Sequence, residues 1–415
     1  MILPLSSVLF ASSALALSVP RDVKDPAYEF PSSLTPEPIE VKFDDNLINE
    51  MIQKVRNYRP SKGFDEGWSD EGPSEGTISG LSSFWADHYD WRATQKEIND
   101  NFTHYALTVP GNRDYQEPIP LHYIHHRSDS TNATPLLLVH GWPSSHLEWA
   151  KVIEPLTQKG YDVVAVDLPG FGFSPAPTKS GMGPREMGGA FDALMLQLGY
   201  DKYGLVSTDL GWIVGMWMVS DSSNIIGHFT DFYWPEVTQD DLDRQAKNET
   251  SAEENAWINS SVAWANSHAA YSTLHVQKPL AGALTMADSP VGFAGWMWDL
   301  TRTANDGYPD DFQDMITDAL MLWFPGPFAN IRSYRTIFTM RNFPSTEVPT
   351  GVTAWGFAHG PFPEISNINF APKHVLERAA ANLVFYNRHE RGGHFPAKTE
   401  PDLWLADVEQ FFSGL

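Results

Sequence analysis

The sequence has 415 residues, of which 42% are hydrophobic and 19% charged, a balance typical of a globular protein rather than a disordered one. Its formal net charge of −24 repels phosphate backbones and anionic lipid headgroups, so a nucleic-acid partner is not expected. The sequence contains no cysteine, which excludes disulfides, cysteine metal ligands and a cysteine nucleophile.

The first 16 residues form an apolar run without a charged side chain. The run ends in Ala14-Leu-Ala16, which fits the small-x-small pattern of a signal-peptidase site. It is shorter than the ~20 residues of a spanning helix, so we expect a signal peptide, a secreted or endomembrane-luminal protein and no stable membrane span. Four Asn-x-Ser/Thr triplets agree with that location and give the candidate glycosylation sites Asn101, Asn132, Asn248 and Asn259.

Residues 17–115 are predicted to form an extension ahead of the catalytic core. The segment from 17 to about 40 is rich in proline and serine and is expected to be extended. Apolar residues recur at helical spacing over 44–56 and again over 84–98. Between them, residues 61–80 are dense in glycine, serine and acidic side chains and are expected to form a loop.

From residue 116 onward, short apolar runs alternate with helical patterns. This alternation predicts a mostly parallel sheet covered by helices on both faces. We expect this core over 116–236 and 349–415, with a helical, tryptophan-rich cap over 237–348 above the carboxyl edge of the sheet. The expected strands are 121–125, 135–139, 161–166, 203–207, 225–232, 351–356 and 382–386, and the expected helices are 147–156, 185–200, 210–218 and 400–412.

The segment Ser207-Thr-Asp209-Leu-Gly211 joins a predicted strand to a predicted helix. It matches the small-x-nucleophile-x-small pattern of a nucleophile elbow, whose sharp turn requires small residues two positions away on either side. The central residue is an aspartate where esterases have a serine, so Asp209 is the candidate nucleophile. Taken alone, the segment fits an ordinary helix N-cap aspartate equally well.

Two further motifs stand where nucleophilic catalysis needs them. His-Gly-Trp-Pro at 140–143 follows a predicted strand, the place from which the α/β-hydrolase fold contributes one backbone N–H, here that of Trp142, to an oxyanion hole. The residue after the nucleophile, Leu210, contributes the second. His394 lies late in the chain on a glycine-rich loop and suits a general base near neutral pH. The order of nucleophile and histidine is the one that this fold requires.

Over nearly all of residues 38–412 the chain resembles the microsomal-type epoxide hydrolase family. The likeness rests on Pro38-Ile-Glu-Val, Phe84-Trp, Asp90-Trp-Arg, the motif at 140–143, Asp167-Leu-Pro-Gly-Phe-Gly-Phe-Ser and Asp288-Ser-Pro-Val-Gly-Phe. The resemblance implies that a small-molecule epoxide is hydrolysed by water to a vicinal diol through an ester on Asp209, without a metal or an organic cofactor. The tryptophan-rich cap favours an apolar secondary metabolite or xenobiotic, hence a role in secondary metabolism or detoxification.

In that family, two tyrosines of the cap hold the epoxide oxygen. Tyr271, eight residues before Pro279, matches the first, and Tyr334, between Ser333 and Arg335, matches the second. The ring oxygen of an epoxide leaves as a poor alkoxide leaving group. Two phenol donors would stabilise that oxygen as its charge develops.

The carboxylate that should orient the ring of His394 has two candidates. Glu364, in Phe-Pro-Glu, is favoured slightly, although it requires an insertion of a few residues in the loop that follows it. Asp231 ends the predicted strand 225–232, and some haloalkane dehalogenases keep their acid after that strand. Typical members of the resembled family have an asparagine at the Asp231 position.

Two alternative functions belong to other classes. A hydrolase similar to haloalkane dehalogenases would also use an aspartate nucleophile, but those enzymes commonly have a tryptophan after it, where this chain has Leu210. A non-hydrolytic cyclase or binding scaffold in small-molecule biosynthesis would tolerate a displaced acid, although Asp209, His394 and the tyrosine pair argue against it. A homodimer is allowed by the sequence.

Overall fold

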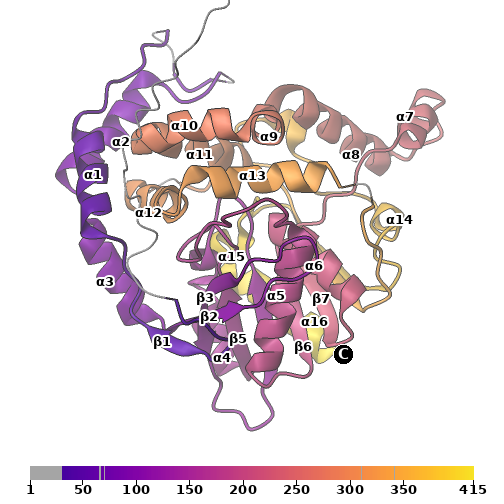
Figure 1. Cartoon of the computed structure of the whole chain (residues 1–415). Helices are drawn as coiled ribbons and strands as arrows, with labels where there is room; N and C mark the ends of the chain where they lie inside the picture. The colour runs from indigo at the N-terminus through magenta and orange to yellow at the C-terminus, as the bar shows by residue number, and fades with distance from the viewer. Residues whose placement is uncertain (1–29, 65–66, 70, 310, 341) are drawn as a thin grey trace, which may run out of the picture.

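A computed structural model describes residues 30–64, 67–69, 71–309, 311–340 and 342–415 (Figure 1). The predicted signal peptide, residues 1–16, lies outside these ranges. Within them, nine strands form one sheet in the order β1-β2-β3-β5-β4-β6-β7-β8-β9. The strands are β1 (Glu37–Ile39), β2 (His104–Val109), β3 (Ile119–His126), β4 (Thr134–Val139), β5 (Tyr161–Val166), β6 (Tyr203–Ser207), β7 (Ile225–Thr230), β8 (Thr350–Trp355) and β9 (Leu383–His389).

The sheet is antiparallel at one edge and parallel elsewhere. The pairs β1–β2, β2–β3 and β3–β5 are antiparallel, and all pairs from β5 to β9 are parallel. Leu137 and Val139 of β4 are buried in one hydrophobic core, and Leu136 and Leu138 are buried in another. Alternate side chains of a strand point to opposite faces, so both faces are covered, and the predicted parallel sheet is confirmed.

Two pairs of helices supply these two cores. On one face, α5 (Pro184–Gln197) and α6 (Asp209–Asp221) contribute buried side chains such as Phe191 and Val214. On the other, α4 (Ile153–Gln158) and α16 (Pro401–Ser413) contribute Ile153 and Trp404. The sheet is therefore the middle layer of a three-layer core.

Between β7 and β8 the chain leaves the sheet and forms helices over the carboxyl ends of the strands (Figure 1). Prolines stand in the first turn of α10, α11 and α13, where the missing backbone N–H has no helical partner to lose. Side chains of α11 and α12 share the core of α5 and α6, so the cap is packed onto the sheet. The cap helices are α7 (Gln239–Ala246), α8 (Ala252–Ala263), the π-helical turn η2 (Trp264–His268), α9 (Ala270–Gln277), α10 (Pro279–Asp288), α11 (Pro290–Ala304), α12 (Phe312–Trp323) and α13 (Pro327–Phe338).

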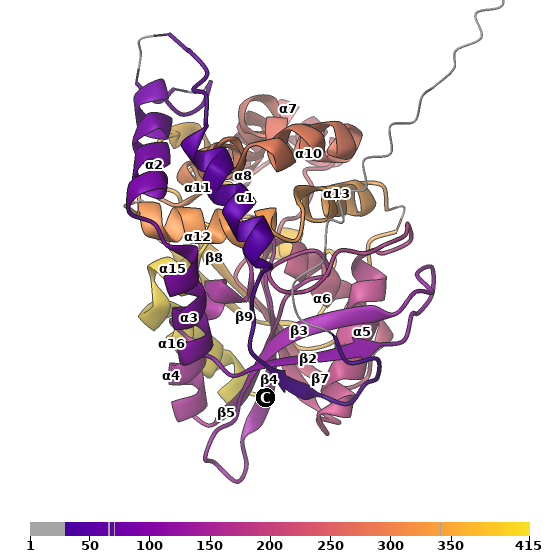
Figure 2. The ribbon, with the colours of Figure 1, turned by 60° about the vertical axis from the view of Figure 1, so that its left-hand side comes forward.

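The N-terminal extension consists of α1 (Asp45–Arg56), α2 (Glu75–Asp87) and α3 (Trp91–Asn101), which run along the side of cap and sheet (Figure 2). The expectation of one helix over 84–98 is wrong, because the chain turns between α2 and α3 and Asp90 caps α3. The side chain of Asp90 accepts a hydrogen bond from the backbone N–H of Arg92 at 2.9 Å. The predicted loop 61–80 also ends early, since Ser74 caps α2.

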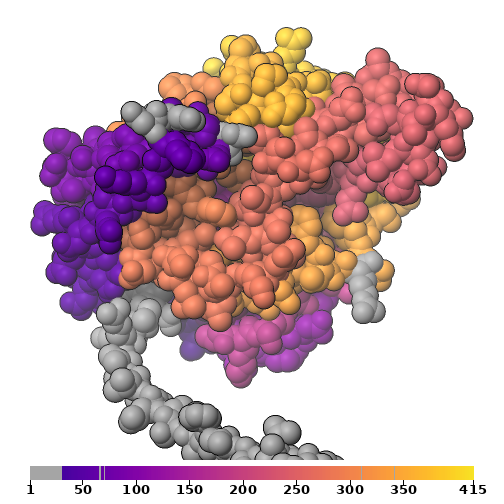
Figure 3. All heavy atoms as spheres, turned by 90° about the horizontal axis from the view of Figure 1, so that it is seen from above, coloured from indigo at the N-terminus to yellow at the C-terminus, as the bar shows by residue number. Residues whose placement is uncertain are grey.

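Helices of the extension pack against the cap. α1 and α2 contact α11, and α2 also contacts α12. Trp85 and Trp91 are buried in the same core as these cap helices, and Lys54 pairs with Asp288 at 2.7 Å. Viewed from above, the extension abuts the cap along one side of the molecule (Figure 3). In the part of the chain that the structure describes, no helix combines the length and hydropathy that crossing a membrane would take.

Candidate active site

Asp209 stands at a sharp turn between β6 and α6. Its φ of 47° lies in the left-handed region, which non-glycine residues rarely adopt. A Cβ on Gly211 would lie 2.2 Å from the carbonyl oxygen of Val139, and one on Gly141 would lie 2.4 Å from Asp209 Cβ. Ser207 is fully buried, with its hydroxyl 2.7 Å from His228 Nε2. Three chain segments approach one another so closely here that only small residues fit at these positions of the motif.

Two backbone amides face the carboxyl group of Asp209. The N–H of Trp142 donates to Oδ1 at 2.7 Å, and the N–H of Leu210 hydrogen-bonds the same carboxyl group. Burial nevertheless raises the pKa of Asp209 to about 7, because desolvation of the carboxylate outweighs the two amides. Two backbone N–H groups that converge on one carboxyl group are the arrangement of an oxyanion hole.

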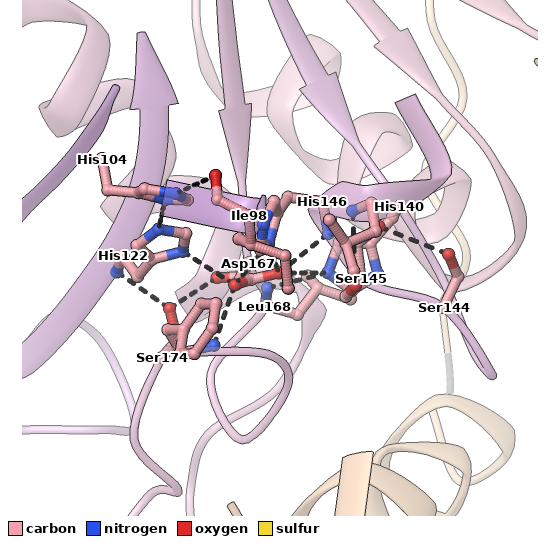
Figure 4. Close-up of polar contacts among 12 residues, drawn as sticks. Ile98, His104, His122, His140, Ser144, Ser145, His146, Asp167, Leu168 and Ser174 are labelled. Carbon is pink, nitrogen blue, oxygen red and sulfur yellow. Dashed lines mark hydrogen bonds and ion pairs between the residues drawn. The ribbon is translucent and has the colours of Figure 1, made fainter. Parts of the chain in front are cut away.

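A buried histidine–aspartate cluster holds the loop that carries Trp142 (Figure 4). Asp167 Oδ1 accepts from the backbone N–H of His146 at 2.9 Å, and Asp167 Oδ2 lies 2.7 Å from His122 Nδ1. At the other end of the loop, His140 Nε2 accepts from the N–H of Leu168 at 3.2 Å. Burial opposes the charge on Asp167, but His146 and His122 hold its pKa well below its ordinary value. An ionised Asp167 therefore holds one end of the oxyanion loop, residues 140–146, at His146, and the backbone of Leu168 holds the other end at His140.

His394 lies on the loop after β9, where Gly392 and Gly393 have φ of 121° and 67°. The backbone N–H of His394 donates to the carbonyl oxygen of Ala304 at 2.8 Å, which ties this loop to the cap. Its Nε2 lies 3.7 Å from Asp209 Oδ2, too far for a direct hydrogen bond. Burial lowers the pKa of His394 to about 4, so the ring is neutral at physiological pH and able to accept a proton.

The two cap tyrosines meet above Asp209. Tyr271 of α9 and Tyr334 of α13 have ring centroids 5.6 Å apart, and their hydroxyl groups hydrogen-bond each other. Burial raises the pKa of both phenols, and the nearby charge of Asp209 raises it further. The indole of Trp142 stacks on Tyr271 at 5.7 Å and 8°. The structure thus brings together Asp209, His394, Tyr271, Tyr334 and the amides of Trp142 and Leu210.

His275 also belongs to this group, and the sequence analysis missed it. It lies one helical turn after Tyr271, with its ring 5.0 Å from that of Tyr334 and 4.8 Å from that of Trp142. Trp296 Nε1 donates to its Nε2 at 3.1 Å. The i, i+4 spacing from Tyr271 was a usable signal, because residues four apart share one face of a helix.

The expected orienting acid Glu364 lies elsewhere. It belongs to the short turn η3 (Pro363–Ile365), its side chain is 47% exposed, and its Oε1 is 3.0 Å from His268 Nε2 of the cap. The loop after β8 places Glu364 against the cap, where it pairs with His268. Among the described residues, no carboxylate makes a hydrogen bond to His394.

The second candidate, Asp231, is close to the nucleophile. It follows β7, is 3% exposed, and accepts a hydrogen bond from Trp404 Nε1 on Oδ2 at 2.6 Å. Its Oδ1 is buried without a hydrogen-bond partner among the described residues, and its charge contributes to the raised pKa of Asp209. Burial raises the pKa of Asp231 itself to about 6. The next residue, Phe232, packs edge-on against the ring of His394 at 4.9 Å.

Comparison with known proteins matches two family models to the chain, the epoxide hydrolase N terminus over residues 36–149 and the alpha/beta hydrolase fold over residues 134–230. Epoxide hydrolase 1 of Sus scrofa is 23% identical over 419 residues, covering 91% of this chain and 88% of that protein. Juvenile hormone epoxide hydrolase of Manduca sexta is 24% identical over 417 residues, covering 89% and 84%. The solved structure of Aspergillus niger epoxide hydrolase has a TM-score of 0.77 at 20% identity, over 93% of this chain and 98% of that one.

The two family models cover complementary parts of the molecule. The first spans the extension and the oxyanion loop, and the second spans the strands that carry the loop and Asp209. The shared architecture with the solved structure extends over core and cap and confirms the predicted α/β-hydrolase fold. The chain is therefore similar to epoxide hydrolases over about nine-tenths of its length, and it has an α/β-hydrolase fold preceded by a segment that matches the epoxide hydrolase N terminus.

Proposed function

We propose that the chain hydrolyses epoxides to vicinal diols, with Asp209 as nucleophile and His394 as general base. The observation that carries this proposal is the placement of a carboxyl group, a neutral imidazole and two phenols around one buried site. The relatives named above are epoxide hydrolases and support the same reaction. Aromatic side chains such as Trp142, Phe232 and Trp296 surround the site and favour an apolar epoxide.

In the first half-reaction, Asp209 Oδ2 attacks a ring carbon of the epoxide. The bond between that carbon and the ring oxygen breaks, and an ester of Asp209 forms. Tyr271 and Tyr334 donate hydrogen bonds to the departing oxygen, which takes a proton from one of the two phenols. The product of this step is a hydroxyalkyl ester of Asp209 and a phenolate.

In the second half-reaction, His394 removes a proton from a water molecule whose oxygen attacks Cγ of the Asp209 ester. Charge develops on Oδ1, where the N–H groups of Trp142 and Leu210 stabilise it. The bond from Cγ to the alkyl oxygen then breaks, and that oxygen takes the proton back from His394. Asp209 returns its own proton to the phenolate, so one epoxide and one water give one diol.

We further propose that Asp231 orients the ring of His394. This proposal is supported by the unpaired, buried Oδ1 of Asp231, by its electrostatic effect on Asp209 and by the contact of Phe232 with His394. A carboxylate in this role holds the correct tautomer of the histidine and stabilises the imidazolium that forms.

One turnover in ¹⁸O-water tests the nucleophile and the mechanism together. With enzyme in excess over an aryl epoxide, we expect one label in the peptide that contains Asp209, since water attacks the carbonyl carbon of the ester. Diol formation without label in that peptide would remove Asp209 from covalent catalysis. A parallel assay for halide release from haloalkanes separates this reaction from the dehalogenase alternative, for which Leu210 gives no indole donor.

We also propose that the chain enters the secretory pathway and carries N-linked glycans. The support is the apolar, uncharged N-terminal run together with the four triplets, whose asparagines are all exposed on the folded chain: Asn101, Asn132, Asn248 and Asn259. A homodimer remains a prediction, which light scattering of the purified protein tests.

A further inference from the structure

A cavity lies beside the candidate active site. It has a volume of about 70 Å³ and is lined by residues that include Pro143, Ser144, Glu148, Asn305 and Phe395. Its rim is exposed, since the side chain of Asp314 is 57% accessible, whereas Glu148 at its inner end is only 5% accessible. The cavity therefore runs from the surface to a buried carboxyl group.

Glu148 sits on the short turn η1 (His146–Trp149), which follows the oxyanion loop. Both carboxyl oxygens of Glu148 are buried, and neither has a partner of good hydrogen-bond geometry among the described residues, although the nearby hydroxyl of Ser144 acts to lower the pKa of Glu148. The neighbouring hydroxyl of Ser144 donates to the carbonyl oxygen of Ser145 at 3.3 Å. A buried carboxyl group without partners is strongly disfavoured, so a bound water is the natural partner for it. A cavity of about 70 Å³ exceeds the ~10–15 Å³ that one water needs on the same measure.

The cavity adjoins the groups that hydrolyse the ester. Pro143 directly follows the oxyanion donor Trp142, and Phe395 directly follows His394. Asn305 directly follows Ala304, whose carbonyl oxygen holds the backbone of His394.

The tyrosine pair is absent from the lining of this cavity. Neither Tyr271 nor Tyr334, which hold the epoxide oxygen, contributes to its walls. Asp209 and His394 do not line it either, so the cavity ends at Pro143 and Phe395, the chain neighbours of Trp142 and His394, on a wall that contains neither tyrosine.

The charges of Asp231 and Asp209 act on the carboxyl group of Glu148. Burial raises its pKa well above the ordinary value, and the charges of Asp231 and Asp209 raise it further. A glutamic acid that keeps its proton can both donate to a water and accept from it. It also adds no negative charge beside Asp209.

From this arrangement we propose that the cavity admits the hydrolytic water and that Glu148 positions this water between His394 and the Asp209 ester. The inference rests on the proposed function, because it concerns only the second half-reaction. An apolar epoxide that fills the space under the tyrosines would leave water no path from that side. A separate inlet would supply water while the ester is in place.

Two substitutions of Glu148 test the inference in the full-length chain. Glu148→Leu removes both polar atoms, whereas Glu148→Gln keeps one donor and one acceptor without a charge. A single turnover of an aryl epoxide is quenched at intervals, and the mass of the Asp209 peptide gives the rates of ester formation and ester hydrolysis. Glu186→Gln is the matched control, because Glu186 is a buried glutamate on α5 that lines neither the cavity nor the active site.

We expect Glu148→Leu to form the ester at the wild-type rate and to hydrolyse it about 10- to 100-fold more slowly, so that the ester accumulates. Glu148→Gln should hydrolyse it within about threefold of the wild type, as should Glu186→Gln. Hydrolysis at the wild-type rate in Glu148→Leu would overturn the inference. Equal loss of both steps in the Leu and Gln variants, with a lower melting temperature, would show a structural role and overturn it too.

The failure of the proposed function would be visible in the same experiment. If the wild-type chain forms diol but no ester on Asp209, the nucleophile is wrong and the inference falls with it. If the wild type forms and clears the ester, the Glu148 variants alone decide the inference.

Discussion

Asp209 and His394 have pKa values shifted in opposite directions by the same burial. The carboxyl group of Asp209 titrates at about 7 and the imidazole of His394 at about 4. Both shifts favour the neutral form, because an apolar surrounding penalises either charge. The site therefore has a neutral base over the whole physiological range and a nucleophile that is only partly ionised at neutral pH.

The two half-reactions should consequently differ in pH dependence. Ester formation needs the carboxylate, so its rate should fall about tenfold per pH unit below pH 7 and level off above it. Ester hydrolysis needs the neutral imidazole, so its rate should stay constant between pH 5.5 and 8. Rapid-quench measurement of both rates across this range checks the prediction. Ester formation that is independent of pH would show that Asp209 is fully ionised in the site.

Substitution of the two acids distinguishes Asp231 from Glu364. Asp231→Asn keeps an acceptor for Trp404 but loses the charge that would stabilise the imidazolium. We expect ester hydrolysis to slow about 10²- to 10⁴-fold, with ester formation unchanged. Glu364→Gln loses only its pairing with His268 at the half-exposed turn η3 and should stay within about threefold of the wild type. A large loss in Glu364→Gln would reverse the assignment.

At the level of elements, the elbow depends on how closely β4 approaches the start of α6. The two segments are so close at Gly211 that a methyl group would overlap the backbone of Val139. The oxyanion loop is also held at both ends by hydrogen bonds. Asp167 accepts from the backbone N–H of His146, and His140 accepts from the backbone N–H of Leu168. The nucleophile and its two amides are therefore positioned by packed backbone rather than by flexible side chains.

A pair of glycine substitutions measures this constraint. Gly211→Ala should destabilise the fold by about 1–3 kcal/mol or more, because β4 and α6 must separate, and activity should be lost as Asp209 moves. Gly80→Ala, on the exposed face of α2, meets only a side-chain atom of Phe312 at 3.6 Å. It should be neutral or stabilising by up to ~1 kcal/mol, because alanine is the better helix former. Thermal unfolding and turnover of both variants give the comparison, and equal effects would contradict it.

At the level of the whole molecule, the extension, cap and sheet are packed as one unit. Aromatic residues such as Trp85 and Trp91 of the extension share a core with cap helices α11 and α12. The active site lies where cap and sheet meet, so the extension supports the tyrosines indirectly by fixing the cap. The net charge of −24 is unfavourable for binding nucleic acid.

Expression in a eukaryotic host tests the proposed secretion. We expect the secreted chain to begin after Ala16 and to lose apparent mass when it is treated with an N-glycosidase. A variant with all four sequon asparagines changed to glutamine should show no such loss. An intact N-terminus on an unglycosylated intracellular chain would contradict the proposal.

The sequence by itself determined the elements and residues whose geometry is local. The continuous apolar runs gave the buried parallel strands, and the elbow and the motif at 140–143 named Asp209, Leu210 and Trp142. Such motifs can be read from sequence because a sharp turn admits few residue types. The family resemblance added Tyr271 and Tyr334, and the structure brings these residues together with His394.

Tertiary structure decided what depends on packing between distant segments. The antiparallel strand β2 exists because β1 and β3 pair with it on either side. Glu364 was favoured as the orienting acid by its position in the chain, yet it pairs with His268 of the cap, while Asp231 is buried near Asp209. The burial of Glu148 beside a cavity is likewise set by residues more than 150 positions apart, and no local pattern encodes it.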